Sequence, residues 1–381
     1  MSMLDGKLTL VASIQSGLEI VLKHELINLG YEPSGAINGR ISFEGTMKDV
    51  ARANMFLRTA SRVYVLLSKF KATTFDELFD SVNIIPWEDI LPSDLGVVVT
   101  AKALKSTLMA FSSIQSITQK AIIVRLMKKR GQNRLPDKNK VTVEVSIYED
   151  EVCVYLDTSG DALHKRGYRT LVGDAPLRET LAAGMILLSF WKHDRVLLDP
   201  FVGSGTIPIE AALIGRNIAP GKNRNFHYEK FANGTKFKDK ALEEAISLEQ
   251  DNALRIYGYD INPKAIKLAV KHATSAGVDK HIHFQTADMK TFSSRFAHGI
   301  IITNPPYGER LKSDNLGNLY SEFWSMYNRL DNWSAYILSA YPSVEKQFGK
   351  KADKVRKLHN ADIKCNYYQY YGEPPASKNK S

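Results

Sequence analysis

Residues 303–310 read Thr-Asn-Pro-Pro-Tyr-Gly-Glu-Arg and follow the apolar run Gly299-Ile-Ile-Ile302. A short β-branched run predicts a buried parallel strand, so we expect this stretch to form the loop at the strand's carboxyl end, where open α/β sheets bind ligands. The prolines lack N–H donors but keep carbonyl acceptors. With the Asn304 amide and the Tyr307 ring, the loop is suited to hold an exocyclic amino group and stack on a base. The alternative is a proline-rich turn that only caps a strand.

A glycine-rich turn comes earlier in the chain. Arg195–Asp199 reads as an apolar strand, Pro200-Phe-Val-Gly-Ser-Gly-Thr206 as a turn and Ile207–Leu213 as a helix. Strand, turn and helix of this kind form the first unit of a doubly wound sheet, in which glycines let the backbone approach a ligand. A dinucleotide-binding fold is the alternative, but Pro208 stands where the last glycine of that fingerprint belongs, and no acid follows about 20 residues later.

Acidic residues end the predicted strands. Ile256–Asp260 is an apolar strand ending in a carboxylate, which suits a ribose diol. A helix over 265–276 and a strand over 281–286 follow, and Asp288 comes directly after them. Asp199, Asp260 and Asp288 thus close three successive strands, and the Asn-Pro-Pro-Tyr loop closes a fourth. Any one acid could be a helix cap, but the whole set predicts a single ligand site.

The composition is ordinary for a globular protein. The chain has 381 residues, 44% hydrophobic and 24% charged, which predicts two or three domains with a substantial core. No apolar run approaches the ~18 residues that span a bilayer and no signal peptide is evident, so we expect a cytoplasmic protein without membrane contact. Cys153 and Cys365 lack Cys-x-x-Cys spacing, so we expect neither a disulfide framework nor a metal site.

The positive charge is concentrated in one segment. The chain carries a net charge of +10, and residues 101–140 hold ten Lys or Arg against the single acid Asp137. A solvated helical face is one explanation. The concentration favours a surface that binds the phosphates of RNA. The residues that we expect to contribute are Lys128, Lys129, Arg130 and Arg134. The insertion 216–240 holds seven Lys or Arg and is either a second RNA contact or a solvated loop.

Two sequence signatures resemble those of a known family. Asp-Pro-Phe-Val-Gly-Ser-Gly-Thr over 199–206, together with Asn-Pro-Pro-Tyr, resembles the signature of class I S-adenosylmethionine-dependent amino-methyltransferases. The order of elements resembles the THUMP-containing RNA guanine-N2 methyltransferases, in particular the bacterial enzymes that act on 23S ribosomal RNA. Further matches are His-Lys-Arg-Gly-Tyr-Arg over 164–169, Ala-Pro-Leu-Arg-Glu over 175–179 and Ile-Ala-Pro-Gly over 218–221.

The resemblance implies an α/β architecture in three parts. These are a ferredoxin-like domain over 1–70, a THUMP RNA-binding domain over 71–160, and a Rossmann-like class I methyltransferase domain over 161–381 with a mostly parallel seven-stranded sheet. The two N-terminal domains are expected to be α+β. The connector that carries residues 164–169 is expected to join the RNA-binding part to the catalytic part.

The resemblance also implies site residues. S-adenosyl-L-methionine would be the cofactor, with Asp199, Gly203 and Gly205 along its methionine end, Asp260 at the ribose, and Asp288 with Met289 at the adenine. The cofactor set is completed by Phe201, Ser204, Thr206, Ile261 and, near the methionine end, Thr180. The catalytic residues would be Asn304, Pro305, Pro306 and Tyr307. The Asn304 and Pro305 oxygens would hold the guanine amino group while Tyr307 stacks on the base.

Several functions remain open from the sequence alone. A transfer-RNA guanine-N2 methyltransferase has the same layout, and Asn-Pro-Pro-Tyr also occurs in enzymes that methylate adenine N6 in DNA. A non-catalytic RNA-binding factor is a third reading, which the intact set of Gly203, Gly205, Asp260 and Asn304 disfavours. A dinucleotide oxidoreductase comes last, because its fingerprint is incomplete.

Overall fold

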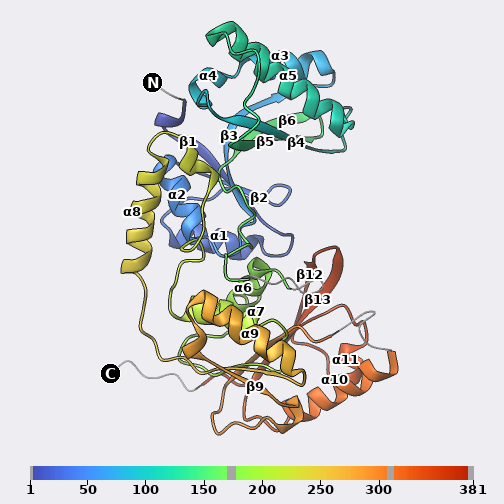
Figure 1. The fold of residues 1–381 in the computed structure, drawn as a ribbon. Helices are drawn as coiled ribbons and strands as arrows, with labels where there is room; N and C mark the ends of the chain where they lie inside the picture. Colours follow the sequence, from blue (N-terminus) through green and yellow to red (C-terminus); the bar gives the residue numbers. More distant parts are fainter. Residues whose placement is uncertain (1–2, 170–176, 307–312, 376–381) are drawn as a thin grey trace. The chain divides into compact units, whose positions relative to one another are not determined.

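The computed structural model describes residues 3–169, 177–306 and 313–375 (Figure 1). The chain forms two compact units. Unit 1 comprises residues 1–14, 23–163 and 224–245, and unit 2 comprises residues 15–22, 164–223 and 246–381. The chain therefore crosses between the units several times. Each unit is organised around one sheet.

The sheet of unit 1 has six strands in the order β2-β1-β3-β6-β5-β4. The strands are β1 (Leu8–Ser13), β2 (Arg40–Gly45), β3 (Arg62–Lys71), β4 (Gly96–Leu104), β5 (Lys140–Tyr148) and β6 (Glu151–Asp157). The pair β4 and β5 is parallel, and the other neighbours are antiparallel. Because β3 pairs with β6, one continuous sheet runs through both N-terminal parts of the sequence.

The helices of unit 1 begin and end at recognisable signals. They are α1 (Glu19–Asn28), whose first four residues belong to unit 2, α2 (Met47–Phe56), α3 (Phe75–Ile84), α4 (Trp87–Ile90) and α5 (Phe111–Arg130), preceded by the short η1 (Met3–Asp5). Thr74 accepts the Glu77 N–H and closes a capping box at the start of α3, which typically contributes about 1 kcal/mol. Gly131, with φ of 66°, ends α5 in the left-handed conformation that glycine adopts without strain. Figure 1 shows α3 and α5 on one side of the β4–β6 strands.

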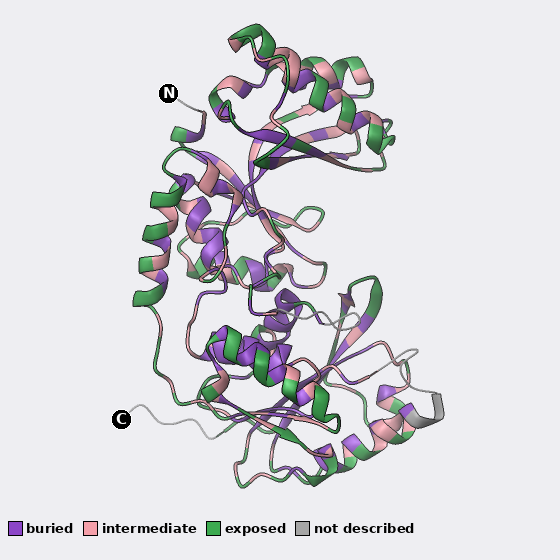
Figure 2. Cartoon of the chain, in the orientation of Figure 1, coloured by how far each residue is buried: buried purple, intermediate pink, exposed green. Residues whose placement is uncertain are grey.

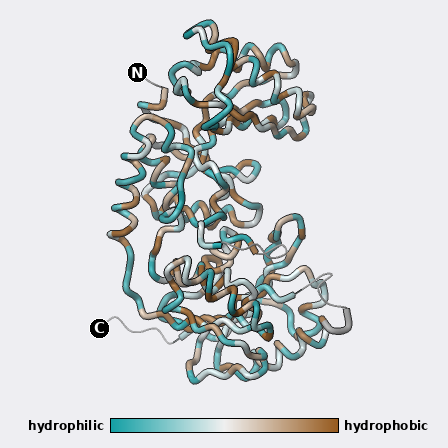
Figure 3. Tube along the Cα trace, viewed as in Figure 1, coloured by the Kyte–Doolittle hydropathy of each residue, from teal (hydrophilic) through white to brown (hydrophobic). Residues whose placement is uncertain are grey.

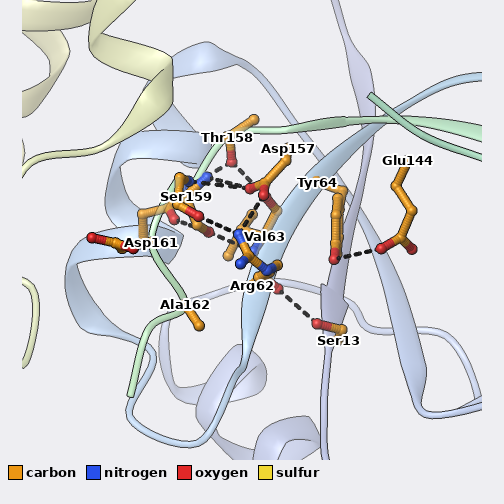
Figure 4. Close-up of polar contacts among 12 residues, drawn as sticks. Ser13, Arg62, Val63, Tyr64, Glu144, Asp157, Thr158, Ser159, Asp161 and Ala162 are labelled. Carbon is orange, nitrogen blue, oxygen red and sulfur yellow. Dashed lines mark hydrogen bonds and ion pairs between the residues drawn. The ribbon is translucent and has the colours of Figure 1, made fainter. Parts of the chain in front are cut away.

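The turn after β6 is held by a buried polar network (Figure 4). The Asp157 carboxylate pairs with Arg62 and accepts the N–H groups of Ser159 at 2.9 Å and Gly160 at 3.2 Å. The Thr158 hydroxyl donates to the carbonyl of Val63 at 2.7 Å. Burial raises the pKa of Asp157, against the opposing effect of Arg62. The network anchors the end of the last strand to β3.

Part of the insertion packs within unit 1. It forms η2 (His227–Lys230) and α8 (Gly234–Ser247). Glu244 on α8 makes a two-pronged ion pair with Arg52 on α2, with nitrogen–oxygen distances of 2.7 and 2.8 Å. The Tyr228 N–H donates to the carbonyl of Thr158 at 3.0 Å. Residues 224–245 are therefore structured and bound to unit 1, so they are not a solvated loop.

The sheet of unit 2 has seven strands in the order β12-β13-β11-β10-β7-β8-β9. They are β7 (Leu197–Asp199), β8 (Ile256–Asp260), β9 (Ile282–Thr286), β10 (Ile300–Thr303), β11 (Ser334–Ser339), β12 (Lys354–Asn360) and β13 (Ile363–Tyr370). Strands β7 to β11 are parallel, whereas β13 is antiparallel to both β11 and β12. The predicted mostly parallel seven-stranded sheet is confirmed.

The helices of unit 2 pack against this sheet. They are α6 (Glu179–Leu187), α7 (Thr206–Gly215), α9 (Pro263–Ala276), α10 (Ser313–Tyr327) and α11 (Val344–Phe348), with the short η3 (Asp279–His281) and η4 (Met289–Thr291). Nearly every residue of α6 and α7 is buried, and hydrophobic residues dominate this region of the chain (Figures 2 and 3). An aromatic cluster under α10 includes Phe323 and Trp333. No helix within the described ranges is both long and apolar enough to cross a membrane.

Candidate active site

Four adjacent strands of unit 2 end on one edge of the sheet. The order β10-β7-β8-β9 makes these strands neighbours, and all are parallel. Asp199 and Asp260 are the last residues of β7 and β8, Asp288 follows β9, and Asn304 follows β10. The groups that the sequence placed at successive strand ends therefore lie side by side at the carboxyl edge, where this architecture binds ligands.

Asp199 joins two of these strand ends. It is 2% exposed, and its Oδ1 accepts the Thr303 hydroxyl at 2.7 Å and the Phe201 N–H at 3.2 Å. Burial raises the pKa of Asp199 to about 7, the two hydrogen bonds lower it, and nearby Asp260 raises it further. Because Thr303 directly precedes Asn304, the bond fixes the start of the Asn-Pro-Pro-Tyr loop against the glycine-rich turn.

The two glycines of the turn have different roles. The Gly203 N–H donates to the Asp260 carboxylate at 3.0 Å, φ is 50°, and a Cβ at this position would meet no atom within 4 Å. Gly205 has φ of 86°, and a Cβ there would lie 3.0 Å from the Cβ of Ala269. Gly203 thus borders open space suited to a ligand, whereas Gly205 allows the turn to pack closely on α9.

The buried His272 and the half-buried Arg169 bond to the end of the glycine-rich turn. The His272 Nδ1 donates to the carbonyl of Ser204 at 3.0 Å. Burial lowers the pKa of His272, whereas the hydrogen bond to Ser204 raises it. Thr206, the first residue of α7, accepts a hydrogen bond from Arg169 at 2.6 Å. Arg169 lies within the 164–169 motif, from which no role for it was predicted, and no sequence pattern pointed to His272.

The remaining predicted cofactor residues occupy varied environments. Ile261 directly follows β8 and is 75% exposed, which leaves an apolar side chain available to cover a flat ligand. Asp288 accepts the Lys290 N–H at 2.9 Å and so caps η4. Three others pack inward: Met289 and Thr180 are buried, and the Phe201 ring packs against the aromatic cluster, 6.1 Å from that of Phe323.

Asn304 has an unsatisfied acceptor. Its side-chain Oδ1 is buried and accepts no hydrogen bond from any described residue. Pro305 is buried and Pro306 is half-buried beside it. A buried amide oxygen without a donor costs about 1–3 kcal/mol, and a ligand that donates a hydrogen bond to Asn304 would remove this cost. Tyr307 lies outside the described residues.

The basic residues of unit 1 are only partly available to a partner. Lys128 and Lys129 are exposed in the last turn of α5. Arg130 donates to the carbonyl of Leu91 at 2.8 Å, and Arg134 pairs with Asp137. Two of the four residues that the sequence proposed for RNA binding therefore have internal partners.

Comparison with known proteins agrees with this architecture. Three family models match the chain: an RlmL ferredoxin-like domain over residues 9–64, a THUMP domain over 72–157, and an RMKL-like methyltransferase domain over 166–369. Fold and matches together define a class I S-adenosylmethionine-dependent methyltransferase with an N-terminal THUMP module. The chain belongs to the RMKL-like methyltransferase family.

Two relatives illustrate the range of the family. The chain is 41% identical to "Putative RNA methyltransferase YpsC" of Bacillus subtilis, over 98% of this chain and 99% of the relative. It is 34% identical to the ribosomal RNA large subunit methyltransferase K/L of Psychromonas ingrahamii, over 94% of this chain and 49% of that protein. The chain therefore spans about half the length of the K/L relative.

Solved structures of similar proteins share the whole fold. One, described as a predicted N6-adenine-specific DNA methylase from Listeria monocytogenes, is 43% identical, has a TM-score of 0.92, and covers 97% of each chain. Another, SMU.472 complexed with SAH, is 38% identical, has a TM-score of 0.91, and covers 97% of this chain and 99% of its own. The chain is thus similar to a protein whose structure contains S-adenosylhomocysteine, the molecule that remains when S-adenosylmethionine has given up its methyl group.

The residues present fit this cofactor. The space beside Gly203 admits a ligand close to the backbone, the Asp260 carboxylate stands at the end of β8, and Ile261 exposes an apolar surface next to it. A carboxylate suits the ribose hydroxyls and an apolar side chain suits the face of an adenine. The protein is therefore an S-adenosylmethionine-dependent methyltransferase whose own residues suit the cofactor.

Proposed function

We propose that the protein methylates the exocyclic N2 amino group of a guanine in 23S ribosomal RNA. The observation that carries the proposal is the buried Asn304 Oδ1, which lacks a donor among the described residues and stands where the loop after β10 begins. An exocyclic amino group has two N–H bonds to donate. The ribosomal substrate is proposed because relatives that are 30% or more identical are named large subunit ribosomal RNA methyltransferases.

The proposed cofactor contacts follow the order of the strand ends. Asp260 holds the ribose hydroxyls, Gly203 and Gly205 lie along the methionine end, and Asp288 lies near the adenine. S-adenosylmethionine, when bound, supplies an electrophilic methyl group on a sulfonium. Asp199 acts indirectly, because its bond to Thr303 keeps the acceptor loop and the cofactor turn in one arrangement.

The proposed catalytic step depends on positioning. The lone pair of guanine N2 is delocalised into the ring, so the amine is a weak nucleophile. The Asn304 Oδ1 and the Pro305 carbonyl accept its two N–H bonds, align the nitrogen with the methyl group and stabilise the positive charge that develops on nitrogen. The bound cofactor would supply the methyl group and would be left as a neutral thioether, while Asn304 and Pro305 hold the amine in place. The surplus proton on N2 then leaves to water, so no strong base is required.

The target base has to be unpaired or flipped out of its helix, since a paired amino group cannot reach such a pocket. Tyr307, outside the described residues, remains the residue predicted to stack on the base. Lys128 and Lys129 are proposed to contact RNA phosphates. Such contacts fix position and orientation and leave the choice of base to the catalytic site.

The test combines an activity assay with a binding control. Purified protein and labelled S-adenosylmethionine are incubated with total RNA from a strain that lacks the enzyme, and the modified nucleoside is identified by mass spectrometry. We expect N2-methylguanosine in 23S RNA. The Asn304→Ala variant is expected to lose about 100- to 1,000-fold in methyl transfer, the effect of removing one transition-state hydrogen bond. Its affinity for S-adenosylmethionine should stay near that of the wild type.

Other outcomes of these assays would point to a different substrate or a different role for Asn304. Label in transfer RNA would keep the chemistry and change the substrate. N6-methyladenine formed in a parallel DNA reaction would favour the activity for which the Listeria structure is named. If Asn304→Ala lost cofactor binding along with activity, the residue would belong to the cofactor site and the proposed mechanism would fail.

A further inference from the structure

Arg169 connects the starts of two helices in unit 2. Its Nη2 donates to the Thr206 hydroxyl at 2.6 Å and to the carbonyl of Leu177 at 3.1 Å. Its Nε lies 3.5 Å from Oε1 of Glu179, the first residue of α6. Thr206 directly follows Gly205 and begins α7. The guanidinium therefore contacts Thr206, the last residue of the glycine-rich turn of the cofactor site.

This pair of charges is buried but incompletely bonded. The side chains of Arg169 and Glu179 are 13% and 3% exposed. Among the described residues, neither the Arg169 Nε nor the Glu179 Oε2 has a hydrogen-bond partner. Burial raises the pKa of Glu179, against the effect of Arg169, and nearby Glu210 raises it further. Within the described ranges, the carboxylate thus keeps one oxygen, Oε2, without a hydrogen bond, and the guanidinium keeps its Nε–H unused.

We propose that Arg169 and Glu179 bind the zwitterionic amino-acid end of S-adenosylmethionine. The guanidinium receives the α-carboxylate, and the Glu179 carboxylate receives the α-ammonium. The two ligand charges match the two side-chain charges, and charge-assisted bonds of this kind are about twice as strong as neutral ones. The first turn of α7 adds its positive dipole end for the carboxylate, because its N-cap, Gly205, has no side chain to satisfy the N–H groups.

A second buried pair in the same motif provides the control. Arg166 lies 3.6 Å from Glu210, and their side chains are 3% and 0% exposed. Glu210 lies in α7, one helical turn beyond Thr206. Its carboxylate also accepts a hydrogen bond from the Tyr168 hydroxyl at 3.0 Å. This pair is more deeply buried than Arg169 and Glu179, and Glu210 lies one helical turn beyond the end of the glycine-rich turn. Its loss should therefore disturb folding without distinguishing between ligands.

The experiment measures the affinity of the full-length protein for three ligands by titration calorimetry. S-adenosylhomocysteine carries the whole amino-acid end, its decarboxylated analogue keeps only the amino group, and 5′-methylthioadenosine keeps neither. Arg169→Gln should weaken S-adenosylhomocysteine by about 10- to 100-fold, the value of a hydrogen bond to a charged group. The same variant should leave the other two ligands within about twofold of the wild type.

Glu179→Gln should weaken the two ligands that carry the amino group and leave 5′-methylthioadenosine unchanged. Arg166→Gln should change all three affinities equally. Equal losses for all three ligands in Arg169→Gln and Glu179→Gln would overturn the proposal and make the pair a structural support. Should Arg169→Gln fail to fold, the milder Arg169→Lys and Glu179→Gln carry the same comparison. The assay contains no RNA, so its result is independent of the proposed guanine substrate.

Discussion

Replacing Asp199 by asparagine is expected to remove a pH dependence from the protein's stability. Burial raises the pKa of Asp199 to about 7 in the folded protein, whereas an unfolded aspartate has a pKa of about 3.9. Between about pH 4 and pH 7 the folded state thus keeps a proton that the unfolded state has released. The stability due to protonated Asp199 is present below about pH 4 and is lost as the pH rises, by ~1.4 kcal/mol per pH unit and ~4 kcal/mol in all.

Urea unfolding of wild type and Asp199→Asn across this pH range measures the effect, because other titrating groups largely cancel in the difference. The amide keeps an acceptor for Thr303, so the variant's advantage over the wild type should grow by ~4 kcal/mol between about pH 4 and pH 7. Thr303→Val removes a bond that lowers the pKa and should extend the wild-type loss to higher pH. A difference that stays constant with pH would refute the argument from burial.

Two further predictions concern residues whose roles the structure separates. Gly205→Ala should lower the free energy of unfolding, measured by urea titration, by ~1–3 kcal/mol because of strain and overpacking. Gly203→Ala should lower it by only ~1 kcal/mol because of its positive φ, and should weaken S-adenosylhomocysteine binding measured by calorimetry. The double variant Lys128→Ala, Lys129→Ala should bind RNA more weakly and with a smaller dependence on salt, and its melting temperature should not change. Arg130→Ala should instead lower the melting temperature, because it loses internal hydrogen bonds. Unchanged RNA affinity in the double variant would show that the two lysines only form a solvated helix end.

The strand-end groups were predictable because they depend on local patterns. An apolar run ending in Asp199, Asp260 or Thr303 identifies a buried parallel strand, and the carboxyl ends of such strands lie on one edge of the sheet. These patterns depend on neighbouring residues in the sequence, so they can be recognised without knowing the tertiary contacts.

What the sequence could not reveal depends on partners far apart in the chain. The charge run ending in Arg130 reads as one basic surface, yet Arg130 donates to the distant carbonyl of Leu91 as well as to the nearby Gln132 side chain. The His272 ring reads as one polar residue on a helix, and only folding brings it to the carbonyl of Ser204. Polar groups that will be buried or paired carry no local signature that distinguishes them from exposed ones.

The insertion has a consequence for how the chain folds during synthesis. Residues 224–245 complete unit 1, but residues 164–223 of unit 2 are translated before them. Domains usually fold as they emerge, starting from the amino terminus. Here the first unit cannot acquire the Arg52–Glu244 pair until translation has passed residue 244, by which time β7 and α7 of the second unit have already been made. The RNA-binding part is therefore finished only after the catalytic part has begun to form, and neither half can be released intact by a single cut in the chain.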